Sequence, residues 1–284
     1  MTKGYSENIR IIKSDSRAHD GFWVACRHLW AEVVKFRSQI WTVYKQGFRN
    51  SYHGAGLGVV WNFILPIVPV TVYLFLSSIR AIPNFDGVDS ATFLTFGVTI
   101  WFVFAGFVRL PISVVQSRNQ EAMKTSLPLS ASIASSFTAL SFETFVRFLF
   151  VLGVIVFTQS WPTIFSPLLF FFFAAAFFLF FGIGLVLSIL NVIYKDVSRI
   201  VNIVLQYGLF VSGVIFPLGE SDWAIFLSKV NPFAVFVDAC RQIVFSGELD
   251  SWLPFAIWSA IGVLCFLIGC RLFYVMEYRI RGLA

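Results

Sequence analysis

The chain has 284 residues, of which 58% are hydrophobic and 13% are charged, and its formal net charge is +6. A soluble domain usually has about a quarter charged residues, so this composition excludes a soluble globular protein. Positive charges that hold loops in the cytoplasm and attract anionic lipid explain the net charge, and no nucleic-acid partner is needed.

The first apolar pattern along the chain lies between Gly21 and Arg37. Apolar residues recur there at three- and four-residue spacing and include Trp23 and Trp30. This spacing predicts an amphipathic helix on the membrane surface with both tryptophans at headgroup depth. A helix packed on a soluble partner would use the same residues. The polar side of this helix carries Arg27, His28, Glu32 and Lys35.

Six apolar stretches follow that are long enough, or nearly so, to cross a bilayer core, which needs about twenty residues per helix. We predict an all-α membrane protein with six transmembrane helices, divided into a cytoplasmic segment at 1–56 and a transmembrane domain at 57–284. The predicted spans are Leu57–Ile79, Thr92–Leu110, Ile133–Phe157, Phe165–Leu190, Ile200–Phe216 and Leu253–Phe273.

The distribution of basic residues predicts the orientation. If both termini are on one side, that side holds 16 of the 21 lysines and arginines, counting Arg271 at the end of the sixth span. Positive charges near span ends stay in the cytoplasm, so we predict that both termini are cytoplasmic.

A short polar segment, Gln116–Ser126, separates the second and third spans. It is too long for a tight turn, and a helical turn that projects into the cytoplasm suits it. A soluble subunit could act on such a projection.

The fifth connection, Pro217–Ser251, is predicted to lie outside the cell and yet is rich in apolar residues. Asn231 and Pro232 are typical of a helix start, and Gly247 is a plausible stop. We therefore predict two short helices that dip into the outer leaflet. A poorly formed seventh span is the alternative, which Asp238, Arg241 and the resulting odd topology disfavour.

Two ionisable residues lie inside the third span. Glu143 and Arg147 are four residues apart, so they share a helix face and can pair. The pair could steady the bundle, which we favour, or belong to a proton or substrate pathway.

Aromatic residues make up 18% of the chain and include 35 phenylalanines. For the phenylalanine-rich fourth span, we favour contact with lipid over a role in a conduit. Flat rings also suit a conduit for sugars, and Trp101 and Phe104 are the better candidates because Gly97 and Gly106 permit close helix approach.

No nucleotide-binding P-loop occurs, because the chain has no Gly–Lys pair. The three histidines lie within the first 53 residues without a companion motif, so no nucleophilic catalytic arrangement is indicated. Four cysteines lack CxxC spacing and are expected at different sides or depths of the membrane, so we predict neither a disulfide nor a metal site. The chain is not expected to be an enzyme.

Several short patterns occur in order between about residues 45 and 245. Together they resemble the permease subunits of type-two ABC exporters, in the branch that exports O-antigen, capsule and teichoic acid polymers. The matching residues are Leu57, Gly58, Trp61 and Pro66; Gly97, Trp101 and Phe104; Asn119, Lys124, Leu127 and Pro128; Asn191, Val192, Tyr194, Lys195 and Asp196; and Asn231, Pro232 and Arg241.

The resemblance implies a homodimer in the bacterial inner membrane, docked on two separate ATP-binding cassette subunits that bind ATP and magnesium. The permease itself then needs no cofactor. Its substrate would be a lipid-linked polysaccharide. O-antigen is the favoured polymer, and capsular or teichoic acid polymers are the alternatives.

The resemblance also implies roles for particular residues. The polar segment and the surface helix would transmit closure of the ATPase, and the outer helices would gate the exit. Candidates for ATPase coupling are Arg118, Asn119, Glu121 and Lys124. Candidates for the outer gate are Trp223, Phe226, Asn231, Pro232, Phe236 and Arg241. Tyr73 and Phe107 join the conduit candidates, and Lys45, Arg49 and His53 are candidates for binding a lipid pyrophosphate.

Two positions depart from the family pattern. Ser51 precedes Tyr52 where the family often has arginine, and Lys195 precedes Asp196 where arginine is usual. Lysine keeps the charge but loses the two-pronged hydrogen-bonding geometry of arginine.

Two other functions remain open, the export of a small lipid or drug and a membrane-embedded transferase acting on lipid-linked sugar. A transferase needs clustered carboxylates or histidines near a membrane face, and this sequence shows only isolated ones.

Overall fold

A computed structural model describes residues 20–52, 88–121, 127–215, 221–250 and 252–282, together with Arg17, Ile64, Thr71 and Phe75. The described residues form helices, and no strand occurs among them. Outside the described residues lie the predicted first span, Leu57–Ile79, apart from three single positions, and the candidate residues His53, Tyr73 and Lys124.

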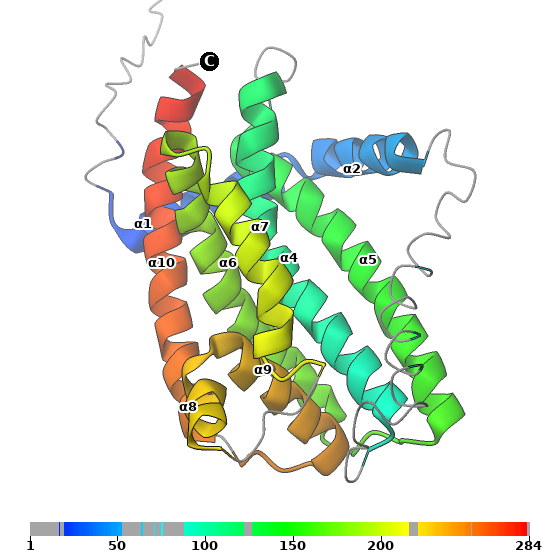
Figure 1. Cartoon of the computed structure of the whole chain (residues 1–284). Coiled ribbons are helices and arrows are strands. Elements are labelled where there is room, and N and C mark those ends of the chain that lie inside the picture. Colours follow the sequence, from blue (N-terminus) through cyan, green and yellow to red (C-terminus); the bar gives the residue numbers. More distant parts are fainter. Residues whose placement is uncertain are drawn as a thin grey trace, which may run out of the picture.

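Four long helices form the bundle (Figure 1). In the described part of the chain, these four are long and apolar enough to cross a membrane, as expected of a multi-pass membrane protein. Helices α4, α6 and α10 run toward the end of the bundle where α10 finishes, and α5 runs the other way (Figure 1). The four are α4 (Ser90–Glu121), α5 (Leu129–Thr158), α6 (Leu169–Ile193, after a 3-10 turn at Ser166–Leu168) and α10 (Trp252–Gly282).

Helix α4 is longer than the predicted second span because it continues through Pro111 to Glu121. A proline inside a helix frees the carbonyl four residues earlier, which here is that of Phe107. Gly184 of α6 lies against this carbonyl, since a Cβ on Gly184 would be 2.9 Å from the Phe107 oxygen. The glycine thus allows α6 to cover the freed carbonyl, and the helix continues.

The predicted fifth span, Ile200–Phe216, is wrong in its bounds, because the helix starts earlier and ends before Phe216. Helix α7 comprises Val197–Val211, and its 15 residues reach roughly 22 Å at 1.5 Å per residue. The chain turns after Val211, and Gly213 has a φ of 65°, which a helix cannot continue through. The helix can end here because Arg241 and Asn231 bind the backbone and side chains of this turn.

Two helices lie at the N-terminal end of the described chain, where one was predicted. Helix α1 (Phe22–Lys35) confirms the amphipathic helix, and Trp23 and Trp30 are 79% and 70% exposed. Its other face packs on α10 and α5. Helix α2 (Arg37–Tyr52) packs on α5 and extends away from the bundle (Figure 1).

Glycines let α6 and α10 approach backbone to backbone. A Cβ on Gly182 would lie 2.6 Å from the backbone nitrogen of Phe266, and one on Gly269 would lie 2.8 Å from the Gly182 oxygen. Such small residues are the usual basis of tight helix packing in membranes, where apolar burial alone does not bring helices together.

The expectation that the phenylalanine-rich fourth span faces lipid is only half correct. Phe170 and Phe171 are exposed, but Phe180 is fully buried and Phe172 nearly so. The difference arises because α6 contacts both α4 and α10, so only one side of it remains open.

We predict that Gly182→Ala will destabilise the protein by about 1–3 kcal/mol, because the new methyl group meets backbone atoms that cannot turn aside. Gly153→Ala in α5 is the matched control, since a Cβ on Gly153 would have no neighbouring atom within 4 Å. That change should be neutral or slightly stabilising through helix propensity. Unfolding in detergent measures both, and equal effects of the two changes would contradict the packing explanation.

Candidate functional site

Two short helices lie at the end of the bundle opposite the C-terminus (Figure 1). They are α8 (Asp222–Val230) and α9 (Pro232–Arg241), and they meet at an angle of 89°. Asn231 caps α9, because its Oδ1 accepts a hydrogen bond from the Phe233 backbone N–H at 3.0 Å. The predicted start of this helix at Asn231 and Pro232 is confirmed.

Arg241, at the end of α9, is buried between three elements. Its Nη1 donates to the Gly213 carbonyl oxygen at 2.7 Å, and its Nη2 donates to the oxygens of Val214 at 2.6 Å and Phe93 at 3.1 Å. The guanidinium also lies over the Phe93 ring, 3.6 Å from its centroid. Gly97 of α4 makes this position possible, because a Cβ there would overlap Nη2 and lie 2.7 Å from Cζ.

The turn after α7 is therefore held by residues of the next helix pair. Arg241 satisfies two carbonyls of this turn, and the Nδ2 of Asn231 donates to the Ser212 Oγ at 2.8 Å. Backbone carbonyls in an apolar region must find protein partners, since lipid offers none. This arrangement explains why α7 can end at Val211 inside the bundle.

A π-helical segment, Gln242–Ser246, follows α9 and ends at Gly247, which has a φ of 78°. The predicted stop at Gly247 is confirmed. Thr163, in the connection between α5 and α6, donates through its N–H to the Val244 oxygen at 2.7 Å and through Oγ1 to the Ile243 oxygen at 2.9 Å. Helix α9 and the π-helical segment are thus attached on one side to α4 and the turn after α7, and on the other to the α5–α6 connection.

The aromatic residues predicted for an outer gate divide into two groups. Trp223 and Phe226 of α8 stack on one another with 5.6 Å between ring centroids and are 72% and 53% exposed. Phe236 of α9 is fully buried against Phe104, Phe180 and Phe255. Helix α8 therefore lies on the surface, whereas α9 belongs to the core.

The predicted conduit residues Trp101, Phe104 and Phe107 are buried within this chain. Trp101 packs on Phe233 with 4.4 Å between ring centroids, and Phe104 stacks on Phe180 at 5.1 Å. Contact with a substrate would require the helices to separate. The conduit role of these residues stays a prediction.

The pair predicted inside the third span forms. Arg147 Nη2 donates to Glu143 Oε2 at 3.2 Å on α5, and the guanidinium lies 5.2 Å from the ring centroid of Phe102. Both charges are thus partnered within one helix face.

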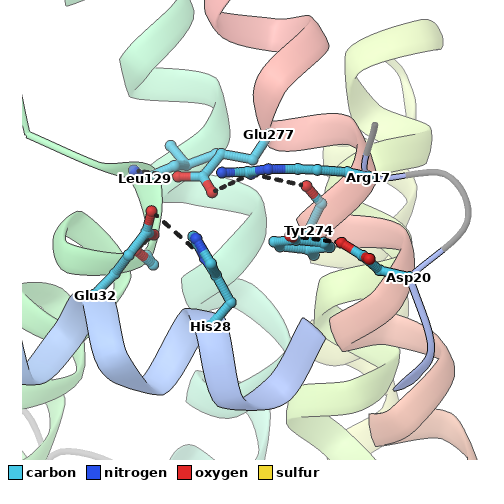
Figure 2. Close-up of polar contacts among 8 residues, drawn as sticks. Arg17, Asp20, His28, Glu32, Leu129, Tyr274 and Glu277 are labelled. Atoms are coloured by element: carbon cyan, nitrogen blue, oxygen red, sulfur yellow. Dashed lines mark hydrogen bonds and ion pairs between the residues drawn. The ribbon is translucent and has the colours of Figure 1, made fainter. Parts of the chain in front are cut away.

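A second polar cluster lies at the opposite end of the bundle (Figure 2). At its centre is Glu277 of α10, which is only 1% exposed. Its Oε1 accepts a hydrogen bond from the Leu129 N–H at 2.8 Å, and its Oε2 lies 3.7 Å from Arg17 Nη1. Arg17 Nη1 also donates to the Tyr274 carbonyl at 3.2 Å, and the Tyr274 hydroxyl donates to Asp20 Oδ2 at 2.9 Å.

Helix α1 joins the same cluster through Glu32 and His28. Ser130 Oγ of α5 donates to Glu32 Oε2 at 2.6 Å, and His28 Nδ1 lies 3.7 Å from Glu32 Oε1. The His28 ring lies 5.1 Å from that of Tyr274. Of the polar side of the predicted helix, Glu32 therefore packs toward α5, whereas the His28 side chain beside it stays 40% exposed.

The structure also brings two cysteines together. Cys26 in α1 and Cys270 in α10 are neighbours whose side chains interact. The expectation that all four cysteines lie apart was wrong for this pair, because α1 lies alongside the last turns of α10.

Comparison with known proteins matches residues 38–245 to the family described as ABC-2 type transporter. The chain belongs to the ABC-2 type transporter family. It is also 23% identical, over 253 residues, to the "O-antigen export system permease protein RfbA" of Myxococcus xanthus. That similarity covers 85% of this chain and 94% of the relative.

In this ABC-2 transporter, the remaining predicted site residues lie near the end that holds the Glu277 cluster. Lys45 and Arg49 are exposed on α2. Arg118, Asn119 and Glu121 lie on the last turns of α4, which ends just before the start of α5. Their predicted roles in binding and coupling stay predictions.

The Glu277 cluster was not found from the sequence. The predicted sixth span ended at Phe273, which placed Glu277 in a solvated tail. An apolar helix extended by one turn would have included it, and a carboxylate inside a span is a functional candidate by default.

We predict that Gly97→Ala and Arg241→Met each lower the unfolding free energy by about 2–4 kcal/mol, because each removes charged hydrogen bonds to buried carbonyls. If Gly97→Ala acts by displacing Arg241, it should cost almost nothing further in the Arg241→Met background. A double-mutant cycle of unfolding in detergent tests this coupling. Additive losses would show that the two residues act independently.

Proposed function

We propose that this chain is the transmembrane subunit of an ATP-driven exporter that moves a lipid-linked polysaccharide, O-antigen, across the bacterial inner membrane. The observation that carries the proposal is the similarity to an O-antigen export permease along 94% of that relative's length. Membership of the ABC-2 type transporter family supports it, since the family match spans residues 38–245.

In this proposal the chain is a homodimer that borrows its energy from two ATP-binding cassette subunits, which hold ATP and magnesium. The lack of a Gly–Lys pair in the sequence is consistent with a separate ATPase. Both termini lie in the cytoplasm, as the distribution of lysine and arginine favours. The end of the bundle with α1, α2 and the Glu277 cluster then faces the ATPase.

The opposite end is then external, and α8 and α9 form a re-entrant pair at the exit. The sharp bend at Asn231 supports this arrangement, as does the location of both helices at the end where α10 begins (Figure 1). Because no residue of α8 is fully buried and α9 is embedded in the core, α8 is the part suited to move during opening.

Deletion of the gene in its source bacterium is expected to remove O-antigen from surface lipopolysaccharide and to leave lipid-linked polymer at the cytoplasmic face. Electrophoresis of lipopolysaccharide and extraction of lipid-linked glycan measure the two pools. The plasmid-borne gene should restore the surface polymer, and the tagged protein should co-purify with an ATP-binding cassette subunit.

The matched control is a partner ATPase with its P-loop lysine replaced. It should assemble with the permease but give the same export defect. Normal O-antigen with loss of a capsular polymer would show that the polymer class is wrong. No change in any surface glycan would refute the export proposal itself.

A further inference from the structure

The start of α5 is an unusual helix terminus, because it has no cap of its own. Its N-cap position is Pro128, which has no side-chain hydrogen-bonding group, and no side chain from this position caps the helix. A helix begins with unsatisfied N–H groups and a partial positive charge, so an acceptor is needed there.

One carboxylate from a distant part of the chain supplies a missing acceptor, and a second binds the side chain of the next residue (Figure 2). Glu277 of α10 accepts from the Leu129 N–H at 2.8 Å, and Glu32 of α1 accepts from the Ser130 hydroxyl at 2.6 Å. The first two residues of α5 are therefore each bound to a different helix. Both carboxylates lie where the helix macrodipole favours negative charge.

Glu277 also connects α5 to the segment that precedes α1. Its second oxygen faces Arg17, whose guanidinium lies 4.4 Å from the centroid of the Tyr274 ring. Since Tyr274 also binds Asp20, both Arg17 and Asp20 of this segment are held to the last turns of α10. A buried charge that loses one partner is costly, so these contacts favour forming and breaking together.

We propose that Glu277 is a positioning residue that makes the start of α5, the end of α10 and helix α1 move as one unit. The inference rests on the proposed function, because the start of α5 directly follows the polar segment predicted to receive the motion of the ATPase. A displacement of that segment pulls on Leu129 and Ser130 and, through the two carboxylates, on α10 and α1. Movement at one cytoplasmic contact thereby reaches the surface helix and the last membrane span.

The chain contains its own reporter of this unit. Cys26 of α1 and Cys270 of α10 lie next to one another, so the rate at which an oxidant joins them reports whether α1 is docked. Replacing Cys240 and Cys265 with serine leaves this pair as the only cysteines. The Cys26→Ser variant gives the background.

Two variants of Glu277 and one control separate the contribution of its hydrogen bond to Leu129 from that of its charge facing Arg17. Glu277→Gln keeps an oxygen that can accept from Leu129 but removes the charge that faces Arg17. Glu277→Met has a similar length and removes both. Glu248→Gln, an exposed carboxylate at the other end of the bundle, is the matched control.

The full-length permease, assembled with its ATPase in membrane vesicles, is used for two measurements. The first is the initial rate of Cys26–Cys270 cross-linking without substrate, and the second is the ATP hydrolysed per polymer delivered. We expect Glu277→Met to slow cross-linking by up to about fivefold, the change in the docking equilibrium constant that corresponds to the loss of a typical helix cap. It should also raise the ATP used per polymer, with Glu277→Gln intermediate and Glu248→Gln unchanged.

Wild-type cross-linking in both Glu277 variants would overturn the proposal, and so would slower cross-linking with an unchanged ratio of ATP to polymer. If Glu277→Met does not insert, the Glu277→Gln variant decides by the same criteria. Failure of the proposed function is distinguishable, because the parent protein would then deliver no polymer while its cross-linking could still be measured.

Discussion

Hydrocarbon offers no hydrogen-bond partners, so every helix that starts, stops or bends within this bundle must have its free backbone groups satisfied by the protein. Three such places occur in the described structure. Arg241 binds the carbonyls at the end of α7, Glu277 binds the first N–H of α5, and Gly184 lets α6 cover the carbonyl freed by Pro111. In each case the partner comes from a distant helix.

This constraint links backbone satisfaction to the way helices are joined. A side chain that caps a helix terminus from another helix also fixes the distance between the two. Arg241 thereby holds α9 to α4 and the turn after α7, and Glu277 holds α10 to α5. The two clusters lie at opposite ends of the bundle, one beside the outer helical pair and one beside the surface helix (Figure 1).

Between these ends, α4, α6 and α10 form a rigid centre. Gly182 and Gly269 bring α6 and α10 into backbone contact, and the rings of Phe104, Phe180 and Phe236 fill the space beside α4. Helices α2 and α8 differ, because most of their side chains are exposed. Parts with few buried contacts open at low cost, which suits elements that meet a partner or a substrate while the centre stays packed.

The sequence by itself determined much of the helical content. Long apolar runs located the third and fourth spans closely, since a span must bury about twenty consecutive residues in lipid. The spacing of Glu143 and Arg147 predicted their ion pair, and Asn231 and Gly247 marked the start of α9 and the end of the segment that follows it. These are local signals, carried by residues that are neighbours along the chain.

Only the tertiary structure decided where α7 ends, which phenylalanines of α6 are buried, and which carboxylate caps α5. Each of these depends on contacts between residues far apart in the sequence, such as Glu277 with Leu129, 148 positions away. Composition and periodicity report how apolar a residue is, but not which neighbour lies against it. Glu32 therefore counted only as part of the polar side of a helix, and packing of α1 on α5 and α10 made it a partner of Ser130.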